Sequence, residues 1–212
     1  PPPAGSGARS RVAHVGWDVA PARVAANGRL CRRRPRPGGT LSDDWDPYAE
    51  PNQLCVNQGE GRFAEVAEGC GPACNDIEVS RGLAAGDLDR DGDIDLVVAN
   101  SNGTVRLYRN ETPRQGHWLA VRAIDPALRR DAIGARIEVQ LDHRVLLRTV
   151  TAARSYFSSA DLTPHFGLGE AERVDRILVR WPDGAIEHFD GGDVDRLRVI
   201  RRGEGRPPTQ DG

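Results

Sequence analysis

Residues 81–110 read RGLAAGDLDRDGDIDLVVANSNGTVRLYRN, and the acidic loop at their centre, DLDRDGDID (residues 87–95), decides how this region folds. Short apolar runs flank the loop, and Ser-Asn-Gly separates the second run from a third. This pattern predicts a strand, an acidic loop, a strand, a tight turn and a further strand. We therefore expect consecutive antiparallel strands here.

The acidic loop carries aspartates at alternate positions and one glycine, Gly92. Such close like charges repel each other, so a bound cation would stabilise them. Calcium takes about six to eight oxygen ligands, and a D-x-D-x-D-G pattern supplies several of them around a glycine turn. The expected calcium ligands are the side chains of Asp87, Asp89, Asp91 and Asp95 and the backbone carbonyl of Asp93.

The loop has three alternative interpretations. An EF-hand needs a glutamate at loop position twelve and a helix on each side, whereas Val98 stands there and IDLVVAN (94–100) predicts a strand. A solvated acidic turn without an ion is the simplest alternative, because most runs of charge are solvated. A catalytic carboxylate pair is not favoured, because no nucleophile, base and oxyanion set lies nearby.

The composition predicts mostly β-structure, since the 212 residues include 24 Gly and 15 Pro between short apolar runs. No apolar run approaches the roughly 20 residues that span a membrane. The first residues, PPPAGSGARSR, lack the apolar core of a signal peptide. Because the chain contains no methionine, we interpret it as a fragment of a longer product.

Charge divides the chain into three segments. Residues 1–40 carry eight Arg and one Asp (net +7), residues 41–111 carry five Arg and fifteen acids (net −10), and residues 112–212 carry sixteen Arg and fifteen acids (net +1). The Arg-rich stretch CRRRPRPGG (31–39) could bind nucleic-acid phosphates. Nucleic-acid binding is nevertheless only an alternative, because no aromatic residues interleave these arginines and the adjoining segment is acidic.

Four cysteines stand at positions 31, 55, 70 and 74. Their spacing does not match the paired ligands of a structural zinc site. A disulfide in an exported protein is the favoured interpretation, and the pairing of Cys31, Cys55, Cys70 and Cys74 stays open.

The first half also contains a repeat. The L-x-x-N tail occurs at residues 54–57 and 107–110, and RVAANGRLC (23–31) aligns with the acidic loop although its aspartates are lost. Residues 1–45 are therefore predicted to be a degenerate or irregular repeat remnant, or the product of a damaged reading frame. A repeat of about four short strands is typical of a propeller blade, and this chain is too short to close a ring.

GDLDRDGDIDLVVANSNGTVRLYRN, with LCVNQGEGRF upstream, resembles an FG-GAP repeat of the VCBS type, over residues 52–111. Gly61 and Phe63 occupy the Gly-x-Phe positions of that repeat. The resemblance implies an incomplete β-propeller blade over residues 46–112, with calcium held at the five aspartate positions named above.

The second half has a different pattern. Short strands are expected at residues 117–124, 134–141, 144–151, 174–181, 185–190 and 196–201. They predict a small β-sandwich or barrel. The stretches DAIGARIEV (131–139), RSYFSSADLTPHFGLG (154–169) and VRWPDG (179–184) resemble the ASPIC/UnbV domain of the cartilage acidic protein family and its bacterial relatives. We expect this domain at residues 115–203 and a disordered tail at 204–212.

Single residues of the second half have expected structural roles. Trp118 and Trp181 are expected in the core or at a domain contact, and Asp183 is expected to shape the Pro-Asp-Gly turn. His165 and Phe166 are expected to pack, or to cap a turn before Gly167-Leu168-Gly169.

The predicted function is that of a non-enzymatic calcium-binding interaction or adhesion module. The resemblance implies an exported protein, secreted or in the cell envelope, whose partner is a protein or a glycan. A glycan-acting hydrolase is a further alternative, but the adjacent Asp43 and Asp44 would diverge on a strand. Ser158, Ser159, Asp161 and His165 lie close in sequence but lack a G-x-S-x-G nucleophile elbow.

Overall fold

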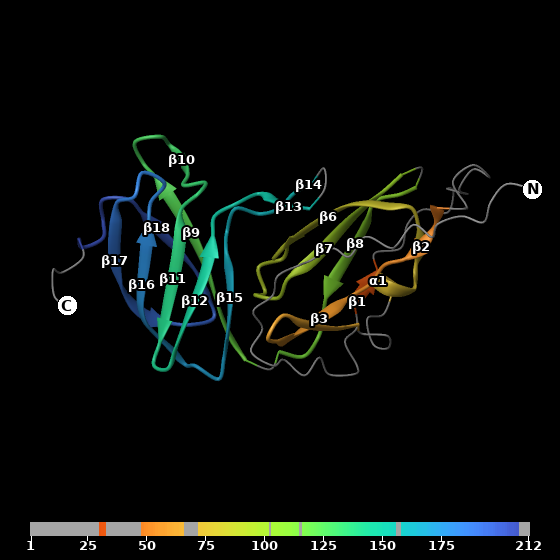
Figure 1. Cartoon of the computed structure of the whole chain (residues 1–212), viewed down its shortest axis with the longest axis horizontal. Helices are drawn as coiled ribbons and strands as arrows, with labels where there is room; N and C mark the ends of the chain where they lie inside the picture. Colours follow the sequence, from red (N-terminus) through yellow and green to blue (C-terminus); the bar gives the residue numbers. More distant parts are fainter. Residues whose placement is uncertain are drawn as a thin grey trace, which may run out of the picture.

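The computed structural model describes residues 30–32, 48–65, 72–101, 103–114, 116–155 and 158–207. Strands predominate, and the one helix of these residues, α1 (Pro72–Asn75), has four residues. Two groups of strands lie end to end, β1 to β8 in one and β9 to β12 with β15 to β18 in the other (Figure 1). The all-β prediction is confirmed. Within the described part of the chain, no helix has the length and apolarity to cross a membrane.

The acidic loop belongs to a four-stranded antiparallel sheet in the order β1-β8-β7-β6. Its strands are β1 (Leu30–Arg32), β6 (Ser80–Gly86), β7 (Asp95–Asn100) and β8 (Arg106–Asn110). The predicted succession of three strands around the loop is confirmed. The upstream strand β1 pairs with Tyr108–Asn110 of β8, and the remainder of the predicted repeat remnant, residues 1–45, lies outside the described residues. No described sheet closes on itself.

The core of this sheet is small and is reinforced by polar contacts. Its buried hydrophobic residues are Ala73, Val98 and Tyr108. The Tyr108 hydroxyl donates a hydrogen bond to Asp76 over 3.0 Å, and burial, followed by the contact with Asp76, raises the pKa of Tyr108. Arg106 forms an ion pair with Glu78 nearby, and each of the two side chains is only 13% exposed.

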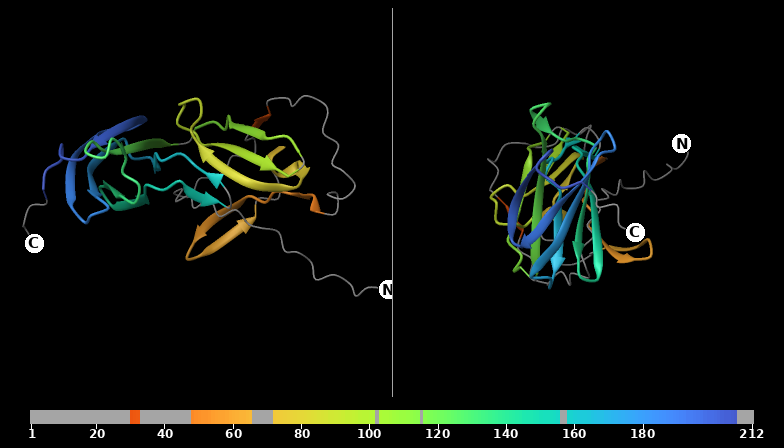
Figure 2. Two further views of the ribbon diagram at one scale, coloured as in Figure 1. Left: turned by 90° about the horizontal axis from the view of Figure 1, so that it is seen from above. Right: turned by 90° about the vertical axis from the view of Figure 1, so that its left-hand side faces the viewer.

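Two short antiparallel pairs precede the acidic loop. β3 (Cys55–Gly59) and β4 (Arg62–Glu65) form an antiparallel hairpin. Its turn residues Glu60 and Gly61 have φ of 52° and 73°, as a two-residue type I′ turn requires. β2 (Glu50–Pro51) pairs with β5 (Ile77–Glu78). The β3–β4 hairpin stands away from the other strands (Figure 2).

The cysteines of the described residues differ in state. Cys74 is disulfide-bonded, whereas Cys55 is free and partly buried. A disulfide sulfur is not available as a thiolate ligand, so Cys74 does not contribute to a zinc site. Cys70 lies outside the described residues.

The second half contains two further four-stranded sheets. One is built from β9 (His117–Asp125), β10 (Arg130–Asp131), β15 (His165–Gly169) and β18 (Arg196–Arg201). The other has the order β12-β11-β16-β17, from β11 (Arg136–Leu141), β12 (Arg144–Thr149), β16 (Arg173–Arg180) and β17 (Ile186–Asp193). Between β12 and β15, the short strands β13 (Ala153–Ser155) and β14 (Ser158–Ser159) pair with each other.

One core lies between these two sheets. Alternate side chains of β11, including Ile137 and Val139, share it with Leu119 and Val121 of β9. This alternation is what a strand with one buried face requires. Trp181 is 1% exposed and belongs to the same core, so the β-sandwich prediction and the core position of Trp181 are confirmed.

Strand β15 decides between two alternative expectations. Phe166 and Leu168 are fully buried in the core, and they alternate with His165 and Gly167 along a strand paired with β9. The segment therefore packs, as expected, but as a strand and not as a cap before a turn. Gly167 and Gly169 hide the strand pattern in the sequence, because glycine is depleted in strands.

Backbone pairing within the described residues continues beyond residue 203. Arg206 exchanges two backbone hydrogen bonds of 2.8 Å with His188 of β17. The first four residues of the predicted tail, 204–207, therefore belong to the described structure, and residues 208–212 lie outside it.

Candidate functional site

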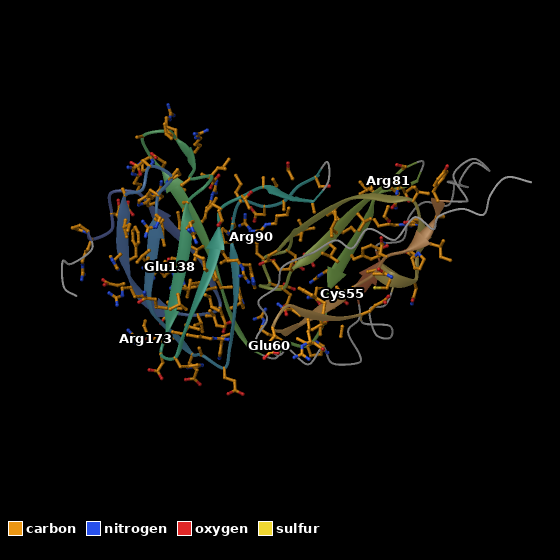
Figure 3. All side chains as sticks on the ribbon, in the orientation of Figure 1. Cys55, Glu60, Arg81, Arg90, Glu138 and Arg173 are labelled. Carbon is orange, nitrogen blue, oxygen red and sulfur yellow. The ribbon has the colours of Figure 1, made fainter. Side chains whose placement is uncertain are left out.

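The acidic loop joins β6 to β7 at a point where the two strands are already paired. Gly86, the last residue of β6, pairs with Asp95, the first residue of β7. Between them Arg90 (φ 64°) and Gly92 (φ 94°) adopt left-handed backbone conformations, which turn the chain sharply and which glycine adopts at low cost. Arg90 lies at the junction of the two groups of strands (Figure 3).

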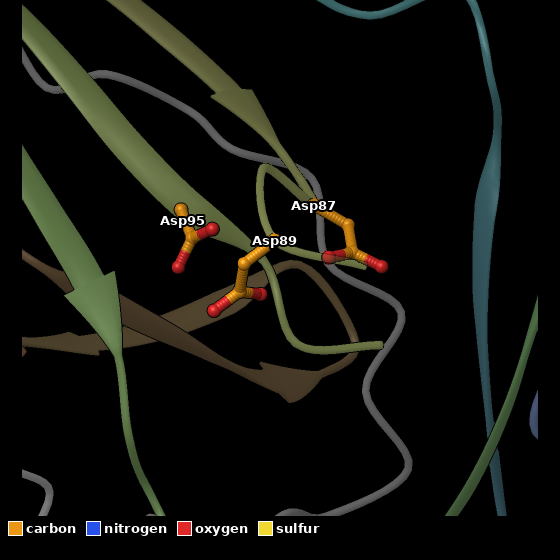
Figure 4. A group of neighbouring side chains, drawn as sticks. All are labelled: Asp87, Asp89 and Asp95. Carbon is orange, nitrogen blue, oxygen red and sulfur yellow. The ribbon is translucent and has the colours of Figure 1, made fainter. Parts of the chain in front are cut away.

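Three of the five predicted ligand positions converge. Asp87, Asp89 and Asp95 each offer a carboxylate oxygen, and these oxygens lie within 4.8 Å of one another (Figure 4). Asp91 and Asp93 do not belong to this group. The structure thus brings together the first, second and last aspartates of the pattern.

Asp95 anchors the base of the loop. It is 2% exposed, and its two carboxylate oxygens accept hydrogen bonds from the backbone N–H of Leu88 (3.0 Å) and of Asn110 (2.8 Å). Backbone donors of this kind satisfy a buried carboxylate. The bond to Asn110 ties the loop to the end of β8, so Asp95 has a structural role without any ion.

Asp87 is less completely satisfied. Its Oδ2 accepts the Gly92 N–H over 3.0 Å, whereas its Oδ1 is buried and has no hydrogen-bond partner among the described residues. Burial raises the pKa of Asp87; its backbone hydrogen bonds oppose this rise, and the charges of Asp91 and Asp89 add to it. A buried oxygen without a partner is costly, and a cation between the three carboxylates would satisfy it.

The other two aspartates shape the far side of the loop. Asp91 Oδ1 accepts the Asp93 N–H over 2.9 Å, an Asx-type contact that favours the turn. Burial raises the pKa of Asp93, and the Arg114 guanidinium, whose nearest nitrogen lies 3.9 Å from the Asp93 carboxylate, opposes the rise.

Two arginines supply positive charge to the loop. Arg109 forms an ion pair of 2.6 Å with Asp89, and Arg114 donates a hydrogen bond to the Asp91 carbonyl. Neither arginine stood among the residues singled out from the sequence, because both follow the loop on or beyond β8. The acid-rich composition of residues 41–111 indicated only that counter-charges were needed.

The donor set fits a hard divalent cation. The oxygens are carboxylates, which suit calcium and magnesium, and the buried Asp87 Oδ1 has no partner of its own among the described residues. Asp87, Asp89 and Asp95 could hold such an ion directly. Arg109 would have to release Asp89 for that oxygen to bind a metal.

The tip of the loop touches the second half of the chain. The His165 Nε2–H donates to the Gly92 carbonyl over 2.8 Å, and a Cβ built on Gly92 would lie 2.1 Å from Trp118 Cε2. The Trp118 and His165 rings stack, with centroids 5.5 Å apart and planes 10° from parallel. Trp118 thus lies at a contact between the two halves, as expected.

Two of the residues considered for catalysis, His165 and Asp161, are engaged in other contacts. His165 donates to the loop carbonyl just described, and burial lowers the pKa of its ring while that hydrogen bond opposes the shift. Asp161 accepts hydrogen bonds from Thr163. Asp183 accepts the Ala185 N–H over 3.2 Å, so its turn-forming role is confirmed. Asp43 and Asp44 lie outside the described residues.

Two relatives and one protein family are similar to parts of this chain. Cartilage acidic protein 1 of Mus musculus is 43% identical over 58 residues, and that of Xenopus tropicalis is 41% identical over 59 residues. Each match covers 27% of this chain and 9% of the relative, so the chain spans under a tenth of the length of these relatives. Residues 126–207 match the family described as ASPIC and UnbV.

The family match begins one residue after β9 (His117–Asp125). The structure nevertheless packs Leu119, Val121 and Ala123 of β9 into the same core as the matched residues. The folded unit therefore includes β9 and is larger than the match. This chain carries an ASPIC/UnbV domain at residues 126–207.

Proposed function

We propose that the chain is a non-enzymatic calcium-binding interaction module, in which an FG-GAP/VCBS-type loop next to an ASPIC/UnbV domain holds the ion. One observation carries the proposal: the buried, unpartnered Asp87 Oδ1 lies beside two further carboxylates, those of Asp89 and Asp95. Repulsion among three carboxylates favours any state that adds positive charge. The sequence pattern D-x-D-x-D-G supports calcium in particular.

The proposed coordination uses the five aspartate positions of the loop. The side chains of Asp87, Asp89 and Asp95 already converge. Asp91 would add its side chain and Asp93 its backbone carbonyl after a local adjustment of the loop. Calcium accepts this because its geometry is flexible and because water can complete a set of about six to eight ligands.

The proposed setting is an exported protein with a protein or glycan partner. The resemblance of the two modules to the cartilage acidic protein family supports this, and so does the disulfide at Cys74, since disulfides persist in oxidising compartments. Extracellular calcium modules bind at roughly 10⁻⁴–10⁻³ M. The expected affinity lies in that range. The Arg-rich segment 31–39 stays an untested alternative site for nucleic acid.

Calorimetric titration of the full chain with calcium tests the proposal. The wild-type chain should take up one ion, and Asp89→Ala and Asp91→Ala should lose or strongly weaken binding. Asp142→Ala is the matched control, because Asp142 is exposed in the β11–β12 turn far along the chain from the loop. Failure of the folded wild-type chain to bind calcium at about 10⁻² M, above the extracellular range, would falsify the proposal.

The non-enzymatic part of the proposal has its own support. His165 donates its Nε2–H to Gly92, so that proton is engaged at the contact between the two halves. Turnover of a glycan or ester substrate by the purified chain, lost on His165→Ala, would contradict this part.

A further inference from the structure

The contact between the acidic loop and the ASPIC/UnbV domain is a joint built from a short series of hydrogen bonds. Asp87 Oδ2 accepts the Gly92 N–H over 3.0 Å. The Gly92 carbonyl then accepts the His165 Nε2–H over 2.8 Å. Gly92 therefore connects a candidate cation ligand to the second half of the chain: its N–H bonds to Asp87, and its carbonyl bonds to His165.

The aromatic pair beneath Gly92 requires the loop to approach closely. A Cβ on Gly92 would meet three atoms of the Trp118 indole at 2.1–2.6 Å. Trp118 is only 9% exposed, and it comes from β9, whereas its stacking partner His165 comes from β15. Only a glycine in this backbone conformation lets the loop lie flat on the pair.

A further contact keeps the two halves together beside this joint. β13 and β14, on the excursion between β12 and β15, lie against β6. Figure 1 shows this excursion reaching from one group of strands to the other. A Cβ on Gly82 of β6 would lie 2.7 Å from the Ser158 hydroxyl, so this contact is also close.

We propose that the Trp118–His165 pair couples cation binding in the acidic loop to docking of the ASPIC/UnbV domain, so that cation occupancy tightens the joint. This inference rests on the proposed calcium function. An ion held by Asp87 Oδ1 leaves Oδ2 on the Gly92 N–H and restricts the motion of both groups. The Gly92 carbonyl is then held in the position that His165 recognises, and less conformational entropy is lost on docking.

Cation binding would also weaken the attraction between Arg114 and Asp93, and this effect opposes the coupling but is smaller. Arg114 lies 3.9 Å from the Asp93 carboxylate and is 40% exposed, and a divalent ion would reduce this attraction. Exposed ion pairs of this kind contribute little because water and salt screen them. The hydrogen bond from His165 joins the two halves directly, over 2.8 Å, and is part-buried, so we expect it to determine the sign of the coupling.

Two indole protons give a direct readout of docking. Trp118 Nε1 is buried and, among the described residues, has no hydrogen-bond partner, so only coverage protects its proton from exchange with solvent. Trp181 Nε1 is buried in the same way, but it lies in the core of the second half. Exchange at Trp118 therefore reports opening of the joint, and Trp181 is an internal control.

The experiment measures indole hydrogen exchange by NMR and calcium affinity by calorimetry, on the full wild-type chain and on His165→Leu. Calcium should slow exchange at Trp118 and leave Trp181 unchanged. His165→Leu should weaken calcium binding by about two- to tenfold, the worth of one net hydrogen bond. Because coupling is reciprocal, the factor by which calcium slows Trp118 exchange should agree with the factor by which His165→Leu weakens calcium binding. His165→Gln, which retains an N–H donor, should lie closer to wild type.

The outcomes separate this inference from the proposed function. If calcium binds while Trp118 exchange and the affinity of His165→Leu stay unchanged, the coupling is refuted and the calcium proposal stands. If the folded chain binds no calcium, both fall. Faster Trp118 exchange on adding calcium would reverse the sign and overturn the inference as well.

Discussion

Replacement of Asp95 by asparagine separates the structural role of this residue from its role as a candidate metal ligand. Asp95 is 2% exposed, and each of its carboxylate oxygens accepts one backbone N–H. Asparagine has a single carbonyl oxygen, so its NH₂ group would face one of the two N–H donors. The substitution therefore leaves a buried donor without an acceptor.

The expected cost follows from that lost acceptor. An unsatisfied buried donor costs about 1–3 kcal/mol. The loss should appear in a calcium chelator, because it does not depend on an ion. Asp89→Asn is the matched comparison: the Asp89 side chain is 31% exposed and pairs with the half-exposed Arg109, and such pairs contribute about 0–1 kcal/mol.

Amide hydrogen exchange measured by NMR in the chelator is the suitable assay. In Asp95→Asn the amide of Leu88 or of Asn110 should exchange roughly five- to 150-fold faster, as about 1–3 kcal/mol implies. In Asp89→Asn both amides should exchange nearly as in wild type. With calcium added, both variants should lack the stabilisation that wild type gains. Wild-type exchange at both amides in Asp95→Asn would refute the structural role.

Three further predictions concern close packing in the two halves of the chain. Phe166→Ala empties a fully buried site and should lower the free energy of unfolding of the second half by about 3–5 kcal/mol, measured by chemical denaturation; a loss below about 1 kcal/mol would contradict this packing. Gly191→Ala would place a Cβ 1.8 Å from the Val174 carbonyl oxygen, so the melting temperature should fall sharply, and an unchanged value would disprove the close approach. Burial, and then the contact with Asp76, raise the pKa of Tyr108 above its ordinary value of 10.0. The unfolded chain therefore loses this proton first, and stability should decline as pH rises above about 10. Tyr108→Phe should remove that part of the decline in denaturation midpoints, and an identical pH profile would count against it.

Much of the fold was predictable from local patterns. The hairpin at Glu60-Gly61 follows from turn chemistry, and the strands around the acidic loop follow from apolar runs bounded by turn residues. The same holds for β11 and β16. Strand β15 was not predictable in this way, because its buried residues Phe166 and Leu168 are interleaved with glycines and a histidine.

The candidate site was predictable only in part. Alternating aspartates around Gly92 indicated a cation loop, but sequence spacing does not say which carboxylates converge. The convergence of Asp87, Asp89 and Asp95 depends on the pairing of β6 with β7 and on the bond from Asp95 to the end of β8. The two arginines that approach the loop, Arg109 and Arg114, were not predictable either, because they lie outside the loop sequence and only the fold brings them to it.

The sequence by itself determined the all-β class and the acidic loop, because periodicity, turn residues and charge spacing act over a few residues. Only the tertiary structure decided that β1 completes the first sheet, that Trp118 stacks on His165, and that both hold Gly92. These contacts join residues far apart in the chain. Their formation depends on which surfaces pack together, and local sequence patterns do not determine which surfaces these are.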